Sequence, residues 1–331
     1  MGSSASSSAN RVSPEFAQVF RAHAAPDGWM SFAEFMALAL FDPKVGYYSR
    51  KSARIGYAAG TDFFTASTSG PVFGELVAAA CTDLLGSVDP GEFEFVELGA
   101  ETEAGVLAGV AHGFGRVRTV RLGTAIELRG KCVVFSNELF DAQPFNRFVH
   151  VNGGWVEIGV ALVDSALIEV RKTVKAPAAL PKKAEPGYVI DAPLQARDLL
   201  IRIAEQPWSG IFVACDYGKS WHELSTCLPQ GTARAYYRHT QSNALLAQPG
   251  EQDLTCHICW DWLVESLIQH GFEHCGVVSQ EMFFIRHAGA YIATAAEADA
   301  ARFSQRKQSL MQLLHPAQLG QRFQVLHAKR A

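Results

Sequence analysis

Apolar positions in this chain fall into short continuous runs, and longer stretches between them carry an apolar stripe at helical spacing. Continuous runs within 131–135 and 211–215 predict buried strands of a parallel sheet, and the segments 93–98 and 117–122 are also predicted to be strands. The striped stretches predict helices at 74–85, 103–111, 194–204, 260–270 and 304–314. Strands that alternate with helices predict an α/β fold.

The rest of the chain has a different pattern. Residues 14–39 read as helical, and Ser31 and Glu34 have the spacing of a capping box. Residues 155–168 alternate in the manner of antiparallel strands, and the proline- and lysine-rich residues 176–186 predict a linker or exposed insertion. The expected domains are a disordered tail at 1–12, a helical cap with a loop at 13–90, and a core at 91–331 with an insertion at about 155–192.

Composition limits the classes of function. Apolar residues make up 48% of the chain and charged residues 19%, and 29 basic against 33 acidic residues give a net charge of −4, which predicts a globular protein without a nucleic-acid partner. Seven cysteines, an odd number, favour a reducing compartment over a disulfide framework. Apolar windows end well before ~20 residues, so we expect no membrane span. The polar start MGSSASSSAN lacks the apolar core of a secretory signal, so a cytoplasmic location is expected.

The segment VVFSNELFDAQP carries the most informative polar residues. A buried strand stops there at Ser136, and Asn137, Glu138 and Asp141 follow. Ligands of open α/β sheets bind beyond the carboxyl ends of the strands. An amide and two carboxylates at such a position predict a site for a polar, cationic group.

Two further strand ends point to the same edge of the sheet. FEFVELG brings Glu97 and Gly99 to the turn where a doubly wound fold accepts a nucleotide-like cofactor. VACDYGK supplies Asp216 and Tyr217 from another strand. A separate loop, GTDFFTAS, carries Asp62, Thr65 and Ser67 and could close over the crevice.

Other chemistries fit the sequence less well. Cys256 and Cys259, with His270 and His274, have the spacing C-x2-C-x10-H-x3-H, but Gly271 interrupts the helix between the histidines, so we predict no metal site. A dinucleotide oxidoreductase would need G-x-G-x-x-G after the first strand, where the chain reads GAETEAG, and the G-x-S-x-G elbow of a hydrolase is missing.

The chain resembles the MidA-like S-adenosylmethionine-dependent methyltransferases, whose mitochondrial members act in the assembly of respiratory complex I. The resemblance runs from about Met30 to the C-terminus. It rests on an ordered series of segments: SFAEFMALALFDPKVGYYSR, GTDFFTAS followed by GPVFGEL, FVELG, VVFSNELFDAQPF, CDYG, GTARAYYRH, AQPGEQDLTCHI and HPAQLGQRFQVL.

This resemblance implies a Rossmann-like class I methyltransferase core of seven strands, an N-terminal helical cap, and S-adenosylmethionine as cofactor. It implies that Asp62, Thr65, Glu97, Gly99 and Asn137 bind the cofactor. The mitochondrial members are similar to protein arginine methyltransferases, so the implied acceptor is a guanidinium in a protein partner.

The same resemblance implies roles for the remaining candidates. Asn137, Glu138 and Asp141 would carry the catalysis, because carboxylates can hold a guanidinium in a bidentate manner and take up its proton. Asp216, Tyr217 and His257 would bind the substrate. A second copy of the chain stays open as a partner.

The chain departs from the family pattern at two places. The cofactor loop, usually Gly-Pro-Gly and another glycine, reads Gly99-Ala100-Glu101-Thr102-Glu103-Ala104-Gly105, and the glutamates would repel the cofactor carboxylate. The interval from Gly99 to Val133 has room for a helix and one strand, so one βα unit could be missing. The strand before Gly123 ends without an acid for the cofactor ribose, a role for which only Glu127 could substitute.

Two hypotheses follow from these departures. The chain is either a working methyltransferase with an atypical cofactor loop, or a methyltransferase scaffold without catalysis that binds or helps to assemble a partner protein.

Overall fold

The computed structural model describes residues 10–49, 71–100, 102–298 and 304–331. The chain divides into two compact units, each made of interleaved segments. Unit 1 contains Met1–Phe63, Asp141–Ala196 and Lys219–Cys259, and unit 2 contains Phe64–Phe140, Arg197–Gly218 and Trp260–Ala331. The domain boundaries expected from the sequence stay predictions.

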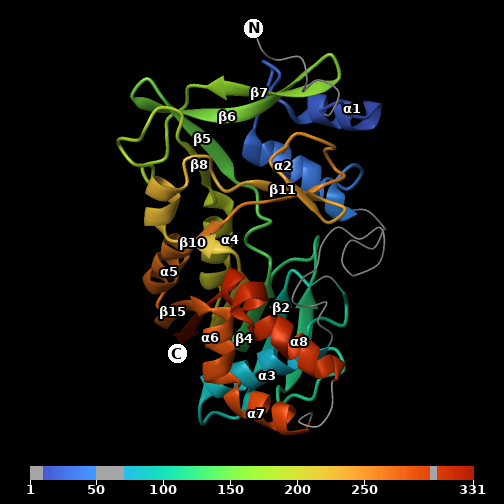
Figure 1. Cartoon of the computed structure of the whole chain (residues 1–331), viewed down its shortest axis with the longest axis vertical. Helices are drawn as coiled ribbons and strands as arrows, with labels where there is room; N and C mark the ends of the chain where they lie inside the picture. Colours follow the sequence, from blue (N-terminus) through green and yellow to red (C-terminus); the bar gives the residue numbers. More distant parts are fainter. Residues whose placement is uncertain (1–9, 50–70, 101, 299–303) are drawn as a thin grey trace. The chain divides into compact units, whose positions relative to one another are not determined.

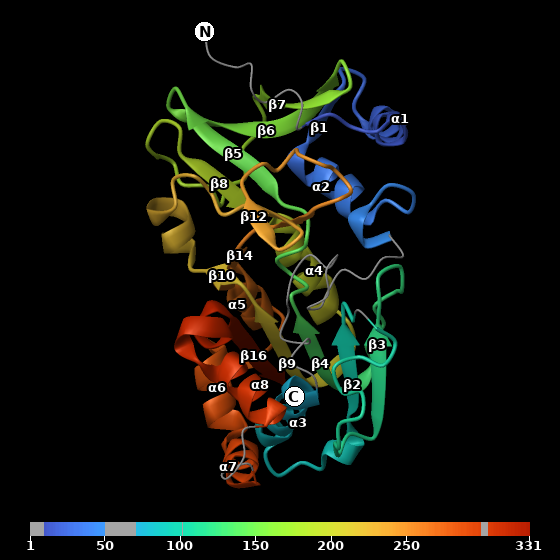
Figure 2. The same cartoon turned by 45° about the vertical axis from the view of Figure 1, so that its right-hand side comes forward.

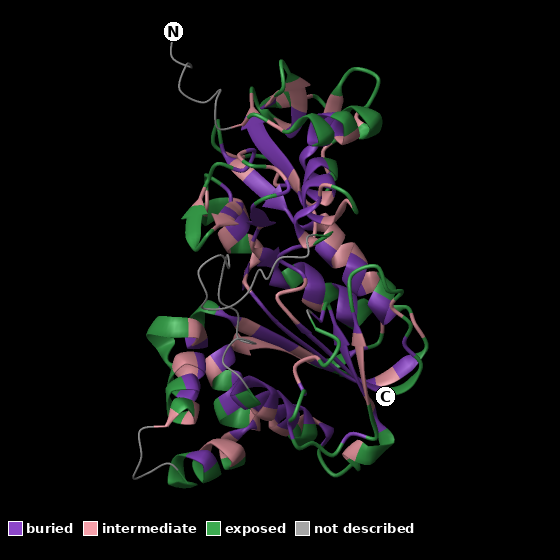
Figure 3. Ribbon diagram, turned by 90° about the vertical axis from the view of Figure 1, so that its right-hand side faces the viewer, coloured by how far each residue is buried: buried purple, intermediate pink, exposed green. Residues whose placement is uncertain are grey.

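Unit 2 contains a six-stranded sheet in the order β15-β16-β9-β4-β2-β3 (Figure 2). Strands β3, β2, β4 and β9 run parallel, whereas β16 is antiparallel to both β9 and β15. Their bounds are β2 Glu94–Leu98, β3 Arg116–Val120, β4 Gly130–Asn137, β9 Trp208–Asp216, β15 Glu273–Ser279 and β16 Gln324–Arg330. Strands β4 and β9 contain buried apolar runs because both faces of the sheet are covered there, whereas the edge strand β3 is only partly buried. Figure 3 shows buried residues along the sheet.

One face of this sheet packs against a group of helices with which it shares a core. The aromatic rings of Phe73 on α3, Phe95 on β2, Phe135 on β4 and Phe284 on α6 meet there. The helices of unit 2 are α3 Pro71–Leu85, α5 Trp260–Gln269, α6 Gln280–His287, α7 Gly289–Ala298 and α8 Gln305–Leu314. Helix α4 (Leu194–Ala204) begins in unit 1 and ends in unit 2.

The sequence predicted this sheet well, apart from one helix. All four predicted strands are present as β2, β3, β4 and β9, and β3 is the one strand of the described residues between Gly99 and Val133. The helix predicted at 103–111 is wrong: turns and irregular backbone occupy that stretch. Gly105 has a φ of +66°, which a helix does not accommodate, and the Val106 amide is bonded to Glu97 instead of a helical carbonyl.

Unit 1 is built on a five-stranded antiparallel sheet with the order β1-β6-β5-β8, in which β7 pairs with β6. Figure 1 shows α2 (Phe32–Phe41) lying against β5 and β6. The predicted capping box is confirmed, because the Ser31 hydroxyl accepts from the Glu34 amide at 3.2 Å and the Glu34 carboxylate accepts from the Ser31 amide at 2.8 Å. Phe32, Phe35 and Phe145 fill the core below α2.

The remaining elements are short. In unit 1 they are α1 Pro14–His23, β1 Trp29–Ser31, β5 Asn146–Val151, β6 Gly154–Val163, β7 Ala166–Lys172, β8 Val189–Ala192, β11 Arg234–Tyr237, β12 Thr240–Ser242 and β13 Asp253–Thr255, with the two-residue strands β10 Gly218–Lys219 and β14 Ile258–Cys259. The predicted antiparallel strands at 155–168 are confirmed as β6 and β7, and residues 176–186 have no helix or strand, as predicted. No helix in the part of the chain that the structure describes combines the length and the apolar character needed to cross a membrane.

Candidate functional site

The candidate site lies in unit 2, at the carboxyl ends of β2, β4 and β9. Glu97 on β2 is paired with Phe135 on β4, and Asn137 on β4 is paired with Cys215 on β9. Phe135 and Cys215 belong to the core that α3 covers. Because side chains alternate between the faces of a sheet, Glu97 and Asn137 therefore lie on the same face, on neighbouring strands.

The turn after β2 is held by hydrogen bonds from two strands. The Glu97 carboxylate is buried, and its Oε2 accepts from the Val106 amide at 2.6 Å. The Thr119 hydroxyl on β3 donates to the Glu103 carbonyl at 3.1 Å. Gly99 has a φ of +76°, and its amide donates to the Val120 carbonyl at 2.9 Å. The turn is thus a fixed part of the site even though no helix follows it in the described residues before β3.

The charge of Glu103, one of the two glutamates expected to repel the cofactor carboxylate, is partly offset. The Glu103 side chain is 92% exposed and lies 3.7 Å from Arg121, so solvent and a cation offset its charge. Glu101 lies outside the described residues, and so do Asp62 and Thr65. Glu127 is exposed after β3, and its carbonyl accepts from Arg118 at 2.8 Å.

Asn137 and Glu138 form the most unusual part of the site. The Asn137 amide donates to Glu138 Oε1 at 3.1 Å, while its buried carbonyl oxygen Oδ1 has no hydrogen-bond partner among the described residues. A buried acceptor without a donor is costly. Glu138 has a φ of 51°, a left-handed conformation that costs about 1 kcal/mol or more for such a residue. The Glu138 amide donates to the Cys215 carbonyl at 2.9 Å, which holds this conformation in place.

Asp216 connects the ends of β4 and β9. Its carboxylate is fully buried, Oδ2 accepts from the Phe140 amide at 2.9 Å, and Oδ1 accepts from the Tyr217 amide at 2.8 Å. The Tyr217 ring packs on Phe323, with 4.0 Å between the ring centres. These contacts fix the loop that carries Glu138, and the predicted role of Asp216 and Tyr217 in substrate binding stays a prediction.

Burial sets the protonation of a thiol beside the site. The pKa of the Cys215 thiol is well above its usual value, first because of burial and then because of Cys81, Asp216 and Glu138. Cys215 is therefore a neutral packing residue at neutral pH.

Two of the predicted site residues belong to unit 1 and are described there. Asp141 is buried, and its carbonyl accepts from the Cys256 amide at 3.2 Å. The pKa of His257 is lowered to about 4, mainly by burial and then by Lys219 and Arg234, so its ring is neutral at pH 7. Among the described residues, no three histidine, cysteine or acidic side chains are grouped as a metal site would require.

Two buried polar residues near Asp141, Tyr48 and its partner Asp253, were not predicted from the sequence. The Tyr48 hydroxyl donates to Asp253 Oδ1 at 3.0 Å, and the pKa of Tyr48 is well above its usual value because of burial, Asp253 and Asp141, in that order. Asp253 lies inside the segment AQPGEQDLTCHI and Tyr48 inside FDPKVGYYSR. Both segments were recognised, but no single residue in them marked a polar contact over 205 positions of sequence.

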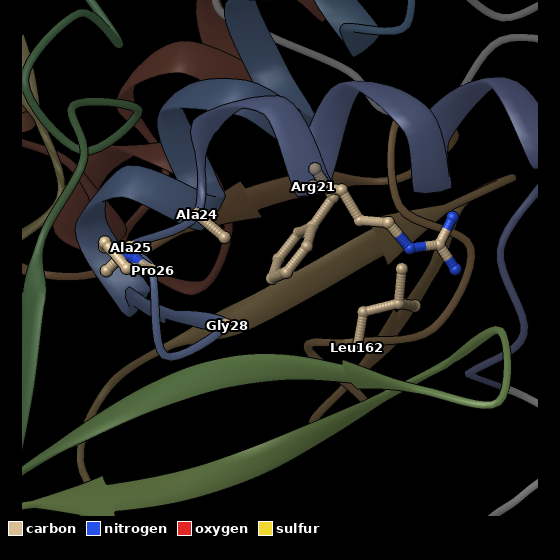
Figure 4. A pocket seen from close by; sticks show the side chains of 7 residues that line it. Arg21, Ala24, Ala25, Pro26, Gly28 and Leu162 are labelled. Atoms are coloured by element: carbon tan, nitrogen blue, oxygen red, sulfur yellow. The ribbon is translucent and has the colours of Figure 1, made fainter.

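A hollow on the surface of unit 1 contains none of the predicted site residues. Figure 4 shows it between the end of α1, the following turn and β6. Its lining consists of Phe20, Arg21, Ala24, Ala25, Pro26, Gly28 and Leu162. Apart from Arg21, this lining is apolar, and it contains no carboxylate or side-chain amide like those at the strand ends of unit 2.

Comparison with known proteins agrees with the geometry of unit 2. Residues 114–278 match the family described as "Putative S-adenosyl-L-methionine-dependent methyltransferase". A crystal structure from Burkholderia thailandensis, of a likely methyl transferase of the COG1565 superfamily bound to S-adenosyl-homocysteine, has a TM-score of 0.83 and 25% identity, covering 96% of this chain and 92% of that one. Residues 114–278 of this chain are thus similar to this methyltransferase family.

Curated relatives extend the comparison to animals. The mitochondrial protein arginine methyltransferase NDUFAF7 of Danio rerio is 24% identical over 298 residues, which cover 71% of this chain and 68% of that protein. Its homolog in Drosophila melanogaster, also mitochondrial, is 24% identical over 389 residues, which cover 97% and 86%. The expectation of a cytoplasmic location is contradicted, because both of these relatives are mitochondrial; a polar N-terminal stretch argues only against a secretory signal.

Proposed function

We propose that this chain uses S-adenosylmethionine to methylate a protein side chain, and that the acceptor is the guanidinium of an arginine. The observation that carries the proposal is the end of β4, where Asn137 presents a buried carbonyl oxygen without a donor beside the strained Glu138. Strain and unsatisfied polar groups persist where a function requires them. The structural relative with bound S-adenosyl-homocysteine and the arginine methyltransferase relatives support the choice of cofactor and acceptor.

The residues present suit the cofactor. S-adenosylmethionine carries an ammonium group and hydroxyl groups, and the unpartnered Asn137 Oδ1 is an acceptor for a donor of that kind. Glu97, Gly99 and Asn137 would line the cofactor side, together with Asp62 and Thr65 from the segment before α3. When bound, the cofactor supplies an electrophilic methyl group on a sulfonium.

The acceptor would be held by carboxylates. A guanidinium is planar, stays protonated at neutral pH and pairs with carboxylates in a bidentate manner. Glu138 would orient the acceptor nitrogen and take up the proton that this nitrogen loses as the new nitrogen–carbon bond forms. Asn137 holds Glu138 Oε1 at 3.1 Å, which favours one orientation of that carboxylate. Orientation of this kind is a main source of rate enhancement in bimolecular transfer.

One observation favours the second candidate, a scaffold without catalysis. Helix N-termini stabilise anionic groups of nucleotide-like ligands, and no helix follows β2 in the described residues up to β3. A chain that lost this interaction would bind the cofactor weakly or not at all, and its protein-binding surface would be its remaining function.

Two measurements in sequence separate the candidates. Isothermal titration of the purified chain with S-adenosyl-homocysteine should give binding in the micromolar range, and the Asn137→Ala variant should bind at least ~10-fold more weakly because it lacks a buried acceptor. Mass spectrometry should then detect methylated arginine in proteins of a mitochondrial extract after incubation with S-adenosylmethionine. The Glu138→Gln variant should bind the cofactor but not transfer the methyl group.

An exposed glutamate provides the matched control. Glu205→Gln, next to α4, should leave both binding and transfer unchanged. If the folded wild-type chain does not bind S-adenosyl-homocysteine at millimolar concentration, the proposal of a methyltransferase is wrong and the scaffold is supported. If Glu138→Gln transfers the methyl group as fast as wild type, the proposed role of Glu138 is wrong, but the proposed activity stands.

A further inference from the structure

We propose that Gly74 on α3 is a positioning residue for the cofactor turn, and that it acts through Val106 on Glu97. In this arrangement the turn after β2 is held between a carboxylate on the sheet and the backbone of a helix. We refer to Gly74, Val106 and Glu97 as the turn clamp. The inference rests on the proposed function, since it concerns the loop that would carry the cofactor.

The contact on the helix side is unusually close. A Cβ atom on Gly74 would lie 2.1 Å from the Val106 carbonyl oxygen and 3.0 Å from Val110 Cγ2. Gly74 lies in the first turns of α3 and is buried, at a position where alanine would favour the helix more than glycine does. A glycine in such a place marks close approach of two backbones. Because the atom it meets is a backbone carbonyl, no side-chain rotation could relieve the clash.

The same residue of the turn is bonded on its other side to the sheet. The Val106 amide donates to Glu97 Oε2 at 2.6 Å. Gly105, with a φ of +66°, permits this bond, since a Cβ there would lie 2.4 Å from the same oxygen. Val106 is therefore bonded through its amide to β2, while its carbonyl packs closely against Gly74 on α3.

This clamp replaces the usual support of the turn. In a βαβ unit the residues after the first strand enter a helix, and its hydrogen bonds hold them. Residues 102–115 have no helix here, so the position of the turn depends on contacts with other elements. The sequence of α3 begins at Pro71, directly after the segment that carries Asp62 and Thr65. Displacement of α3 would thus be transmitted to Glu97.

The clamp assigns Glu97 the role of a hydrogen-bond acceptor, and neutral substitutions can test whether its negative charge is needed. If Glu97 serves as an acceptor for Val106, glutamine should replace it, because its Oε1 accepts the same bond. If the negative charge of Glu97 contacts the cofactor directly, glutamine should fail as alanine does. The pair Glu97→Gln and Glu97→Ala therefore distinguishes the two roles.

The first experiment measures hydrogen exchange at the Val106 amide in the ligand-free protein. We expect Glu97→Gln to keep the protection of this amide, and Glu97→Ala and Gly74→Ala to lose it. Gly289→Ala is the matched control, because Gly289 is also helical and a Cβ there meets nothing within 4 Å. Equal protection in wild type and Glu97→Ala would overturn the clamp, whether or not the chain binds a cofactor.

The second experiment titrates the same variants with S-adenosyl-homocysteine. Gly74→Ala should weaken binding by about tenfold or more, because its Cβ would displace the turn, while Gly289→Ala should bind like wild type. Binding like wild type by Gly74→Ala, together with lost protection of the Val106 amide, would overturn the positioning role. Absence of binding in wild type would instead refute the proposed function and leave the exchange result to decide on the clamp.

Discussion

His257 should make the stability of unit 1 depend on pH between about 4 and 6.5. Its Nδ1 is buried without a partner among the described residues, and burial, Lys219 and Arg234 lower its pKa from 6.5 to about 4. The folded state therefore resists protonation, while the unfolded chain takes up the proton near pH 6.5. Stability is fully present above pH 6.5 and is lost as the pH falls towards 4.

The size of the effect follows from this gap in pKa. One unit corresponds to 1.36 kcal/mol, so a shift from 6.5 to about 4 gives a loss of roughly 3 kcal/mol by pH 4. At pH 5.5 the unfolded state is mostly protonated and the folded state is not, which gives a loss of about 1.4 kcal/mol. Substitution by glutamine, which does not titrate, should remove this loss.

Urea unfolding at pH 7.5 and pH 5.5 measures the difference directly. The free energy of unfolding of wild type should fall by about 1.4 kcal/mol more between these pH values than that of His257→Gln. His222→Gln, a substitution of an exposed histidine in the same unit, controls for the loss of a histidine as such. An equal fall in wild type and His257→Gln would refute the reasoning, because the buried ring would then not be the group that resists protonation.

Four further substitutions test the packing of the two units by their effect on stability. Asp191→Asn should lower the free energy of unfolding by about 3–5 kcal/mol, because the buried Arg147 guanidinium would lose its charge partner, which lies 2.7 Å from its Nε. Glu169→Gln, which removes the half-exposed partner of the same arginine, should lower it by under about 1 kcal/mol. His150→Phe should leave the melting temperature unchanged or raise it, because neither ring nitrogen of this buried histidine has a partner in the described part of the chain, and a large loss would reveal a bond there. Arg330→Ala should cost about 2–3 kcal/mol in urea unfolding, because the guanidinium donates to the Ala204 carbonyl at the end of α4 and to the carbonyls of Gln206 and Trp208 after it, and an unchanged midpoint would contradict this.

The parallel strands of unit 2 could be predicted because their signal is local. A buried strand such as β4 needs a run of apolar residues, and Val133, Val134 and Phe135 supply one. The predicted helix at 103–111 failed for the opposite reason. Its apolar spacing is real, since Leu107 and Val110 enter the core, but the Val106 amide is bonded to a carboxylate nine residues earlier in the chain.

The location of the candidate site could be predicted from the sequence, but most of its contacts could not. The polar ends of β2, β4 and β9 follow from the rule on carboxyl edges, and the structure has Glu97 and Asn137 on one face. The left-handed backbone of Glu138 could not be predicted, because it depends on a hydrogen bond to the Cys215 carbonyl on another strand. The assignment of Asp141 and His257 to unit 1 depends on long-range contacts of the same kind.

The position of β16 in the sheet affects when unit 2 can fold during synthesis. This strand lies between β9 and β15 in the sheet, and it comes later in the sequence than the other five strands of the sheet. Until Gln324–Arg330 are available, the edges of β9 and β15 that face each other through β16 have no partner. We therefore expect unit 2 to fold only after translation of this segment, and nascent chains that stall before residue 324 to become substrates for chaperones and proteases.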